Sequence, residues 1–176
     1  SLPAPRPSRR RAGPPRCGAR VGPTRVRAPV RAGLGCAAML AGAFGFQYIA
    51  GVAPCRLCLW QRWPHAAAVL ILVLALATGW RGLAWAGALA ALTTAGLGLF
   101  HAGVEQGWGE FVSACTQGSI AGLDPAALID PTVATAAPVR CDQIPWSLFG
   151  ISMAGWNAIA SAGLALVWVR AATARD

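Results

Sequence analysis

The sequence has few charged residues, and this shortage argues against an ordinary soluble protein. Only 12% of its 176 residues are charged, whereas soluble domains carry roughly 25%. Hydrophobic residues account for 56% of the chain. Because so few charges cannot cover a water-exposed surface, a soluble monomer is nearly excluded.

Lysine is absent, and acidic residues are absent from the first 31 positions. All fifteen basic residues are therefore arginines, and nine of them lie within those 31 positions. From residue 32 to 176 six arginines balance six acids, so the net charge of +9 belongs to the N-terminal segment. Residues 1–29 combine arginine and proline with almost no large apolar side chain, and we expect them to form a disordered tail beside a membrane. A transit peptide or a nucleic-acid arm has a similar composition, but this tail lacks the interleaved aromatic residues of nucleic-acid-binding surfaces.

Four apolar stretches follow, each about 18 to 23 residues long. A helix of that length crosses a hydrocarbon core of roughly 30 Å. We therefore predict an all-α integral membrane protein with a four-helix bundle over residues 30–170 and a C-terminal segment at 171–176. The expected spans are 32–53, 63–80, 82–100 and 147–169, with a long loop at about 102–146.

Finer features agree with four spans. The short turn Thr78-Gly79-Trp80-Arg81 predicts that the second and third helices are antiparallel neighbours. Ala38 and Gly42 form a small-xxx-small pair, which permits close helix approach. Five tryptophans near the expected span ends are predicted to lie at the membrane–water interface: Trp80, Trp85, Trp108, Trp146 and Trp168.

Arginine counts beside the spans predict the orientation of the chain. Four spans place the N-terminal tail, the Arg81 turn and the C-terminus on one side, which holds most of the arginines. The opposite side carries Arg56, Arg62 and Arg140 together with five of the six acids. We therefore expect both termini to be cytoplasmic and the two other loops to face outward.

The six cysteines sort by side on this map. Cys17 lies in the tail and Cys36 in the first span. The other four lie on the outward side: Cys55, Cys58, Cys115 and Cys141. An even set of four on the oxidising face indicates disulfide chemistry, most simply with Cys55–Cys58 and Cys115–Cys141 as the pairs. Two static disulfides or a four-thiolate zinc site are the alternatives, although the wide spacing of the loop pair weakens the zinc site. Leu59 stands where haem attachment requires a histidine.

The setting of the C-x-x-C favours reactive cysteines. Pro54 precedes it and the second span follows, so both sulfurs lie near a helix N-terminus that stabilises a thiolate. At about 100° per residue, Cys55, Cys58, Arg62 and His65 fall within an arc of about 80°. A static disulfide has no use for an adjacent guanidinium, whereas a thiolate or a bound electron acceptor does.

The chain offers no obvious protein-bound acceptor for the electrons of a dithiol. It contains no nucleotide fingerprint, haem motif or metal-ligand cluster. A quinone dissolved in the bilayer would need only a groove between helices and a hydrogen-bond donor, which Arg62 could supply. His101 at the end of the third span could act likewise, or it could be an ordinary interfacial residue. The outer loop, with a short helix expected at 124–130, could carry its cysteines between a partner and the C-x-x-C.

Several motifs resemble the bacterial disulfide bond formation protein B (DsbB) family. They are Gln47-Tyr48, the run PCRLCLWQRWPH at 54–65, HAGVE at 101–105, Cys141-Asp142 and PWSLFGISMAGWN at 145–157. The resemblance covers about residues 32–170. It implies a quinone-dependent thiol oxidase of the bacterial inner membrane, with its redox cysteines facing the periplasm.

The resemblance also implies a role for each outward cysteine. Cys115 would form the mixed disulfide with a DsbA-like periplasmic oxidase, and Cys141 would resolve it. Cys55 would receive the electrons, and Cys58 would pass them to ubiquinone or menaquinone. Arg62 and His101 match quinone-associated positions, whereas Cys17 and Cys36 match none of the redox positions.

Two other functions fit the same features. A vitamin K epoxide reductase-like protein is also a four-helix bundle with a C-x-x-C and a loop pair, but there the loop cysteines precede the C-x-x-C. A non-catalytic membrane scaffold, with disulfides that only staple its outer loops, belongs to a different functional class.

Overall fold

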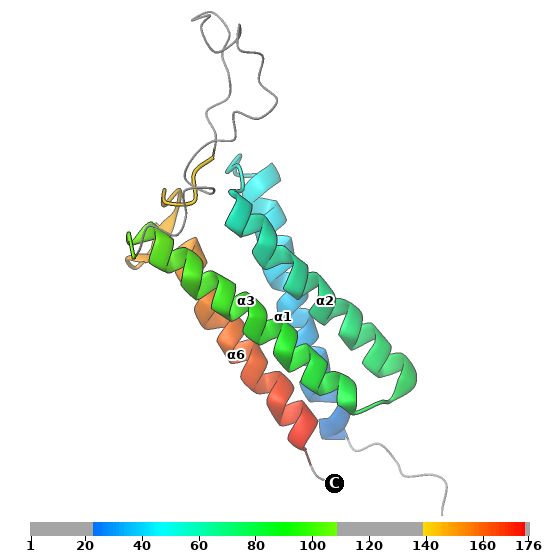
Figure 1. The fold of residues 1–176 in the computed structure, drawn as a ribbon. Coiled ribbons are helices and arrows are strands. Elements are labelled where there is room, and N and C mark those ends of the chain that lie inside the picture. The colour runs from blue at the N-terminus through cyan, green and yellow to red at the C-terminus, as the bar shows by residue number, and fades with distance from the viewer. Residues whose placement is uncertain (1–22, 109–138, 175–176) are drawn as a thin grey trace, which may run out of the picture.

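A computed structural model describes residues 23–108 and 139–174 of the chain. The described part is mostly helical, as predicted, with four long helices side by side (Figure 1). Two strands of two residues each form a small antiparallel hairpin before the last helix. The elements are α1 (Pro23–Tyr48), α2 (Arg56–Thr78), α3 (Gly82–Glu105), β1 (Ser147–Leu148), β2 (Ile151–Ser152) and α6 (Met153–Thr173).

Three of these helices are long and apolar enough to cross a membrane: Arg27–Tyr48 within α1, then α2 and α3. The fourth, α6, has 21 residues and is not among them. Many large apolar side chains of the bundle point outward and are exposed, as a lipid-facing surface requires; they include Leu70, Val73, Leu89, Leu92, Leu99 and Leu166.

The helix boundaries differ from the expected spans. α1 begins at Pro23, inside the segment expected to be a disordered tail, and it ends at Tyr48 rather than at 53. α2 begins at Arg56, seven residues before the expected start at 63. The cause is a local cap, since the Cys55 sulfur accepts a hydrogen bond from the Cys58 N–H and starts the helix there. α3 continues to Glu105, beyond the expected end at 100.

The last helix also begins later than the expected span of 147–169. Residues 147–152, expected to be helical, form the β1–β2 hairpin instead. Its two-residue turn has positive φ at both Phe149 (52°) and Gly150 (76°), the conformation of a tight hairpin turn. α6 then begins at Met153, because the Ser152 hydroxyl caps it by accepting a hydrogen bond from the Gly155 N–H at 3.1 Å.

The close helix contacts do not involve the expected small-residue pair. Nothing lies within 4 Å of a Cβ built on Gly42, so the Ala38–Gly42 pair does not mediate helix packing. Instead, α3 meets α6 at Gly87 and Gly98, where a Cβ would come within 2.5 Å of the Trp168 ring and 2.9 Å of the Ala158 backbone nitrogen. Trp168 is consequently buried in the core, and its predicted interfacial position is wrong.

The bundle has two chemically distinct ends (Figure 1). The start of α1, the α2–α3 turn and the end of α6 lie together at one end, where Gly79 (φ 68°) ends α2 and the core is alanine-rich. The start of α2, the end of α3 and the hairpin lie together at the other end. The antiparallel α2–α3 pair is therefore confirmed, and the fold gathers Cys55, Cys58 and Cys141 away from the described chain ends.

Candidate functional site

The C-x-x-C pair lies at the first turn of α2. The Cys55 thiol donates a hydrogen bond to the Cys58 sulfur at 3.0 Å, and the Cys58 N–H points back to the Cys55 sulfur at 3.3 Å. Both cysteines are free thiols here. The hydrogen bond between Cys55 and Cys58 raises the pKa of the Cys55 thiol, and burial of Cys55 raises it further. Because the Cys55 thiol donates to the Cys58 sulfur, Cys58 is the better-stabilised thiolate of the pair.

Cys141 lies against this pair. It is fully buried in a small cluster with Cys55, Leu57 and Val104, on which Cys58 also packs. The structure therefore brings together three of the four cysteines expected to be catalytic. The fourth, Cys115, lies outside the described residues, as do Cys17 and the short helix expected at 124–130.

Beside Cys141, the outer segment carries an ion pair. Two guanidinium nitrogens of Arg140 bond the Asp142 carboxylate, at 2.9 and 2.5 Å. The Arg140 hydrogen bond lowers the pKa of Asp142. The two residues on either side of the buried cysteine are thus tied to each other at the surface.

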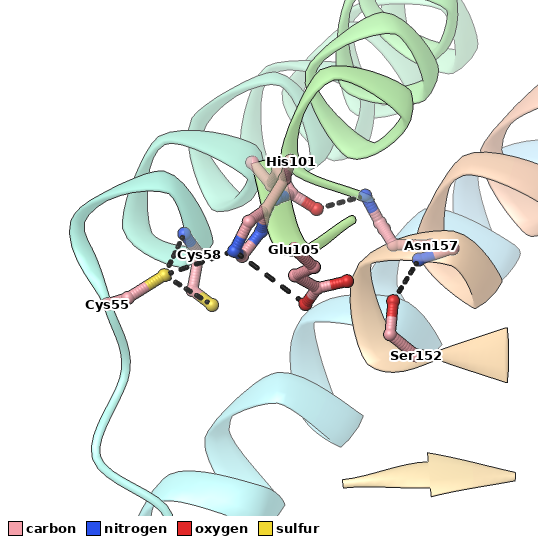
Figure 2. Close-up of polar contacts among 8 residues, drawn as sticks. Cys55, Cys58, His101, Glu105, Ser152 and Asn157 are labelled. Atoms are coloured by element: carbon pink, nitrogen blue, oxygen red, sulfur yellow. Dashed lines mark hydrogen bonds and ion pairs between the residues drawn. The ribbon is translucent and has the colours of Figure 1, made fainter. Parts of the chain in front are cut away.

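His101 reaches the cysteines from the last turns of α3 (Figure 2). Its Nε2 atom lies 3.5 Å from the Cys55 sulfur and 3.9 Å from Glu105 Oε1, and its Nδ1 atom lies 2.9 Å from Gln61 Nε2. The side chain is only 3% exposed. His101 is therefore part of the cysteine site, and the alternative of an ordinary interfacial residue does not fit its contacts.

Arg62 lies two turns into α2 and is held by α1. Its guanidinium donates to Gln47 Oε1 at 2.5 Å and to the Ala43 carbonyl at 3.3 Å, and it lies 4.9 Å above the Phe44 ring. Its Nε atom is buried and has no hydrogen-bond partner among the described residues. The charge is thus fixed in position while one donor stays available to a ligand.

A cavity of about 290 Å³ joins these groups. The four residues predicted to share one helix face, Cys55, Cys58, Arg62 and His65, all line it. The helix runs through Pro64, so the expected arc survives this proline. Apolar side chains of α1 and α6 form much of the wall, and Ala38 and Gly42 belong to this wall.

Further polar residues of the site were not predicted from the sequence. Gln61, Glu105 and Asn157 line the same cavity. Asn157 donates to Gln61 Oε1 at 2.6 Å, and its Oδ1 lies 3.0 Å from His65 Nε2. Their signal was available, because polar groups inside apolar spans are costly and typically functional.

The thiols and His101 could also hold a soft metal ion. The ligand atoms of Cys55, Cys58 and His101 lie within 4.8 Å of one another. This is a different set from the four-thiolate zinc site weighed on the sequence. A metal site with only these ligands would keep one open position.

Comparisons with known proteins identify the family of this chain. The family model "Disulfide bond formation protein DsbB" matches residues 26–171. A "Disulfide bond formation protein B 2" of Pseudomonas savastanoi pv. phaseolicola is 36% identical over 152 residues, 77% of this chain and 81% of the relative. A "Disulfide bond formation protein B" of Verminephrobacter eiseniae is 33% identical over 154 residues, 82% of this chain and 83% of the relative.

A third relative, a "Disulfide bond formation protein B" of Polaromonas sp., is 30% identical over 155 residues, 82% of this chain and 88% of the relative. No solved structure matches the chain. The family model spans all four helices and the cysteine site. The chain therefore belongs to the DsbB family of membrane disulfide bond formation proteins.

Proposed function

We propose that this protein is a thiol oxidase that reoxidises a DsbA-like periplasmic partner and passes the electrons to a membrane quinone. One observation carries the proposal: the Cys55–Cys58 pair borders a cavity that also contains a fixed arginine with a free donor. A purely structural disulfide needs neither the cavity nor the buried charge.

The proposal includes an order of electron transfer, which the packing of Cys141 against Cys55 supports. The partner's two thiols are oxidised to a disulfide as the Cys115–Cys141 disulfide is reduced through a mixed disulfide at Cys115. Cys141, packed against Cys55, then passes the electrons to the Cys55–Cys58 disulfide. Each exchange breaks one S–S bond and forms another, so two electrons and two protons reach the C-x-x-C pair.

The cavity fits a quinone head group. Its volume of about 290 Å³ is at the small end of small-molecule pockets, roughly 300 Å³. Its mainly apolar wall suits the ring, and the unpaired Arg62 Nε suits a ring oxygen. A bound quinone supplies a two-electron, two-proton acceptor. Arg62 orients such a ligand and stabilises negative charge on its oxygen, while His101 holds a hydrogen-bonding atom at the Cys55 sulfur.

The membrane topology belongs to the same proposal. We place all four helices across the bacterial inner membrane, including α6, which runs alongside α3 over its length. The arginine-rich chain start and the chain end then lie in the cytoplasm, and the cysteine end of the bundle faces the periplasm. In this orientation the thiols meet exported partners, and the cavity opens within reach of lipid-dissolved quinone.

The decisive experiment uses the purified full chain with a reduced DsbA-like partner and a short-chain ubiquinone. We expect two thiols of the partner to be oxidised for each quinone reduced. Cys58→Ser should abolish this turnover, whereas Cys36→Ser, which changes a buried cysteine of α1 outside the site, should retain it. Turnover that survives Cys58→Ser would refute the proposal.

A static scaffold predicts a different outcome of a simpler measurement. Structural disulfides resist mild reduction, whereas catalytic ones yield to it. We expect the outward cysteines to become alkylated after treatment with dilute dithiothreitol, as followed by mass spectrometry. Complete resistance would favour the scaffold.

A further inference from the structure

A chain of hydrogen bonds crosses the bundle from Cys55 to His65. It runs from the Cys55 sulfur to His101, then to Gln61 (Nδ1 to Nε2, 2.9 Å), then to Asn157 (Oε1 to Nδ2, 2.6 Å) and finally to His65 (Oδ1 to Nε2, 3.0 Å). Figure 2 shows the cysteine end of this chain, with His101 between the thiols and the α6 residue Asn157. The chain thus links α2, α3 and α6.

Thr94 determines which atom donates and which accepts in every link of this series of hydrogen bonds. The Asn157 Nδ2 atom lies 3.5 Å from the Thr94 carbonyl oxygen and 3.3 Å from its hydroxyl. The carbonyl can only accept, and the hydroxyl already donates its hydrogen to the Gln61 carbonyl at 3.1 Å. Both neighbours are therefore acceptors, so the Asn157 atom facing them must be its NH2 group, and Oδ1 must face His65.

His101 is fixed by the next two links. The Asn157 NH2 group donates to Gln61 Oε1, so the NH2 group of Gln61 faces His101. A neutral imidazole has one donor and one acceptor nitrogen. Nδ1 therefore accepts from Gln61, and Nε2 carries the proton. That N–H faces the Cys55 sulfur at 3.5 Å and Glu105 Oε1 at 3.9 Å.

His65 is fixed from the other side of Asn157. Because Asn157 Oδ1 is an acceptor, His65 Nε2 must be its donor. The Ser161 hydroxyl, 3.4 Å from both groups, donates to Oδ1 and leaves this assignment unchanged. The remaining nitrogen, Nδ1, is then a bare lone pair. It is buried without a partner among the described residues, in a side chain that is 3% exposed and lines the cavity.

We propose that Asn157 and Gln61 are positioning residues that set the tautomers of both histidines. His101 then offers an N–H to the Cys55 sulfur. His65 offers a lone pair to a hydroxyl of a hydroquinone in the cavity. The ligand of His65 rests on the proposed function, whereas the tautomers do not. An acceptor nitrogen can bond the hydroxyl of the reduced carrier but not the carbonyl of the oxidised form. His65 therefore binds the product side of the couple. A metal ion on His101 Nε2 would compete with the proton that this network places there.

Nitrogen NMR tests the tautomers directly. The chain has only two histidines, so the reduced full chain with ¹⁵N-labelled histidine gives four ring nitrogens to assign. We expect protonated Nε2 and unprotonated Nδ1 in both rings. Gln61→Leu should release the His101 tautomer alone, and Asn157→Leu should release both. Ser161→Ala, which removes a neighbour of His65 but leaves the amide links, should change neither.

Either of two NMR results would overturn the network: a proton on His101 Nδ1 in the unmodified chain, or tautomers that Asn157→Leu leaves unchanged. Because these measurements need no quinone, they remain decisive even if the proposed function fails.

Ligand binding tests the role of His65. In a Cys58→Ser background, which blocks electron transfer, His65→Phe should weaken binding of a short-chain ubiquinol by about tenfold, as the loss of one buried hydrogen bond predicts. Binding of the matching ubiquinone should change less than about twofold, because its oxygen gives Nδ1 no hydrogen. Equal losses for both forms, or no loss, would refute the assignment. If the unmodified cavity binds neither ubiquinol nor ubiquinone, both the proposed function and the role of His65 fail.

Discussion

The spacing of α3 and α6 depends on Gly98, and this dependence can be tested with a matched pair of substitutions. A Cβ on Gly98 would lie 2.9 Å from the Ala158 backbone nitrogen and 3.0 Å from the Ala154 carbonyl oxygen, so backbone would have to move. Gly96, on the same helix, has nothing within 4 Å of such a Cβ. Gly98→Ala therefore combines a helix-propensity gain with a steric cost, and Gly96→Ala has only the gain.

The expected magnitudes follow from these contacts. Replacing glycine by alanine inside a helix stabilises it by about 1 kcal/mol, and overpacking a close contact costs about 1 to 3 kcal/mol. The propensity term cancels between the two variants, so Gly98→Ala should be less stable than Gly96→Ala by about 1 to 3 kcal/mol. For a chain of this size the difference corresponds to a Tm about 2 to 12 °C lower.

Thermal unfolding of both variants in the same detergent measures the difference. The turnover assay gives a second readout, because α3 carries His101 and α6 carries Asn157, so Gly98→Ala should also lower the rate of partner oxidation. Equal Tm values for the two variants would refute the close α3–α6 approach. A stable Gly98→Ala protein with full activity would show that the network tolerates displacement of α6.

Three further predictions concern the site. Arg62→Lys should raise the KM for quinone by about tenfold or more, because a lysine cannot bond α1 and still offer a free donor to the ligand, and hydrogen bonds to charged groups contribute about 1.5 to 3 kcal/mol. Steady-state kinetics would measure the KM, and an unchanged value would contradict the role of Arg62. In the reduced protein, iodoacetamide should modify Cys58 before Cys55, because the pKa of the Cys55 thiol is raised; mass spectrometry of a time course would give the order, and the reverse order would contradict it. The Arg140 hydrogen bond lowers the pKa of Asp142, so this ion pair stabilises the fold above the ordinary carboxyl pKa, and that stability is lost as the pH falls through the lowered pKa of Asp142. Asp142→Asn should remove this fall of Tm at acid pH, and an unchanged dependence of Tm on pH would argue against the Arg140–Asp142 pair.

The helical class and the approximate helix positions could be predicted from the sequence because they depend on local pattern. Runs of apolar residues long enough to span a bilayer require helices, since the backbone must satisfy its own hydrogen bonds there. The helix ends were less predictable. The start of α2 is set by the Cys55 sulfur acting as a cap, and the start of α6 by Ser152 after a hairpin, neither of which hydropathy reports.

The role of small residues was predictable in kind but not in place. The Ala38–Gly42 pattern suggested a helix contact, yet these residues line the cavity, and the close approaches occur at Gly87 and Gly98. Likewise Trp168 near a helix end suggested an interfacial ring, but it fills the core opposite Gly87. A spacing motif identifies a residue able to pack closely, and only the neighbouring helix determines whether it does.

The sequence by itself determined the helical class, the family and the position of Cys55, Cys58 and Cys141 at one end of the bundle, because each depends on residue type and order along the chain. Arg62 and the C-x-x-C could be singled out for the same reason, since they lie within two turns of one helix. The tertiary structure alone decided that Cys141 packs on Cys55 and that His101 reaches the thiols. It also decided that Gln61 and Asn157 link the two histidines. These pairs are separated by 40 to 96 positions, and a hydrogen bond across helices depends on distances that no local pattern encodes.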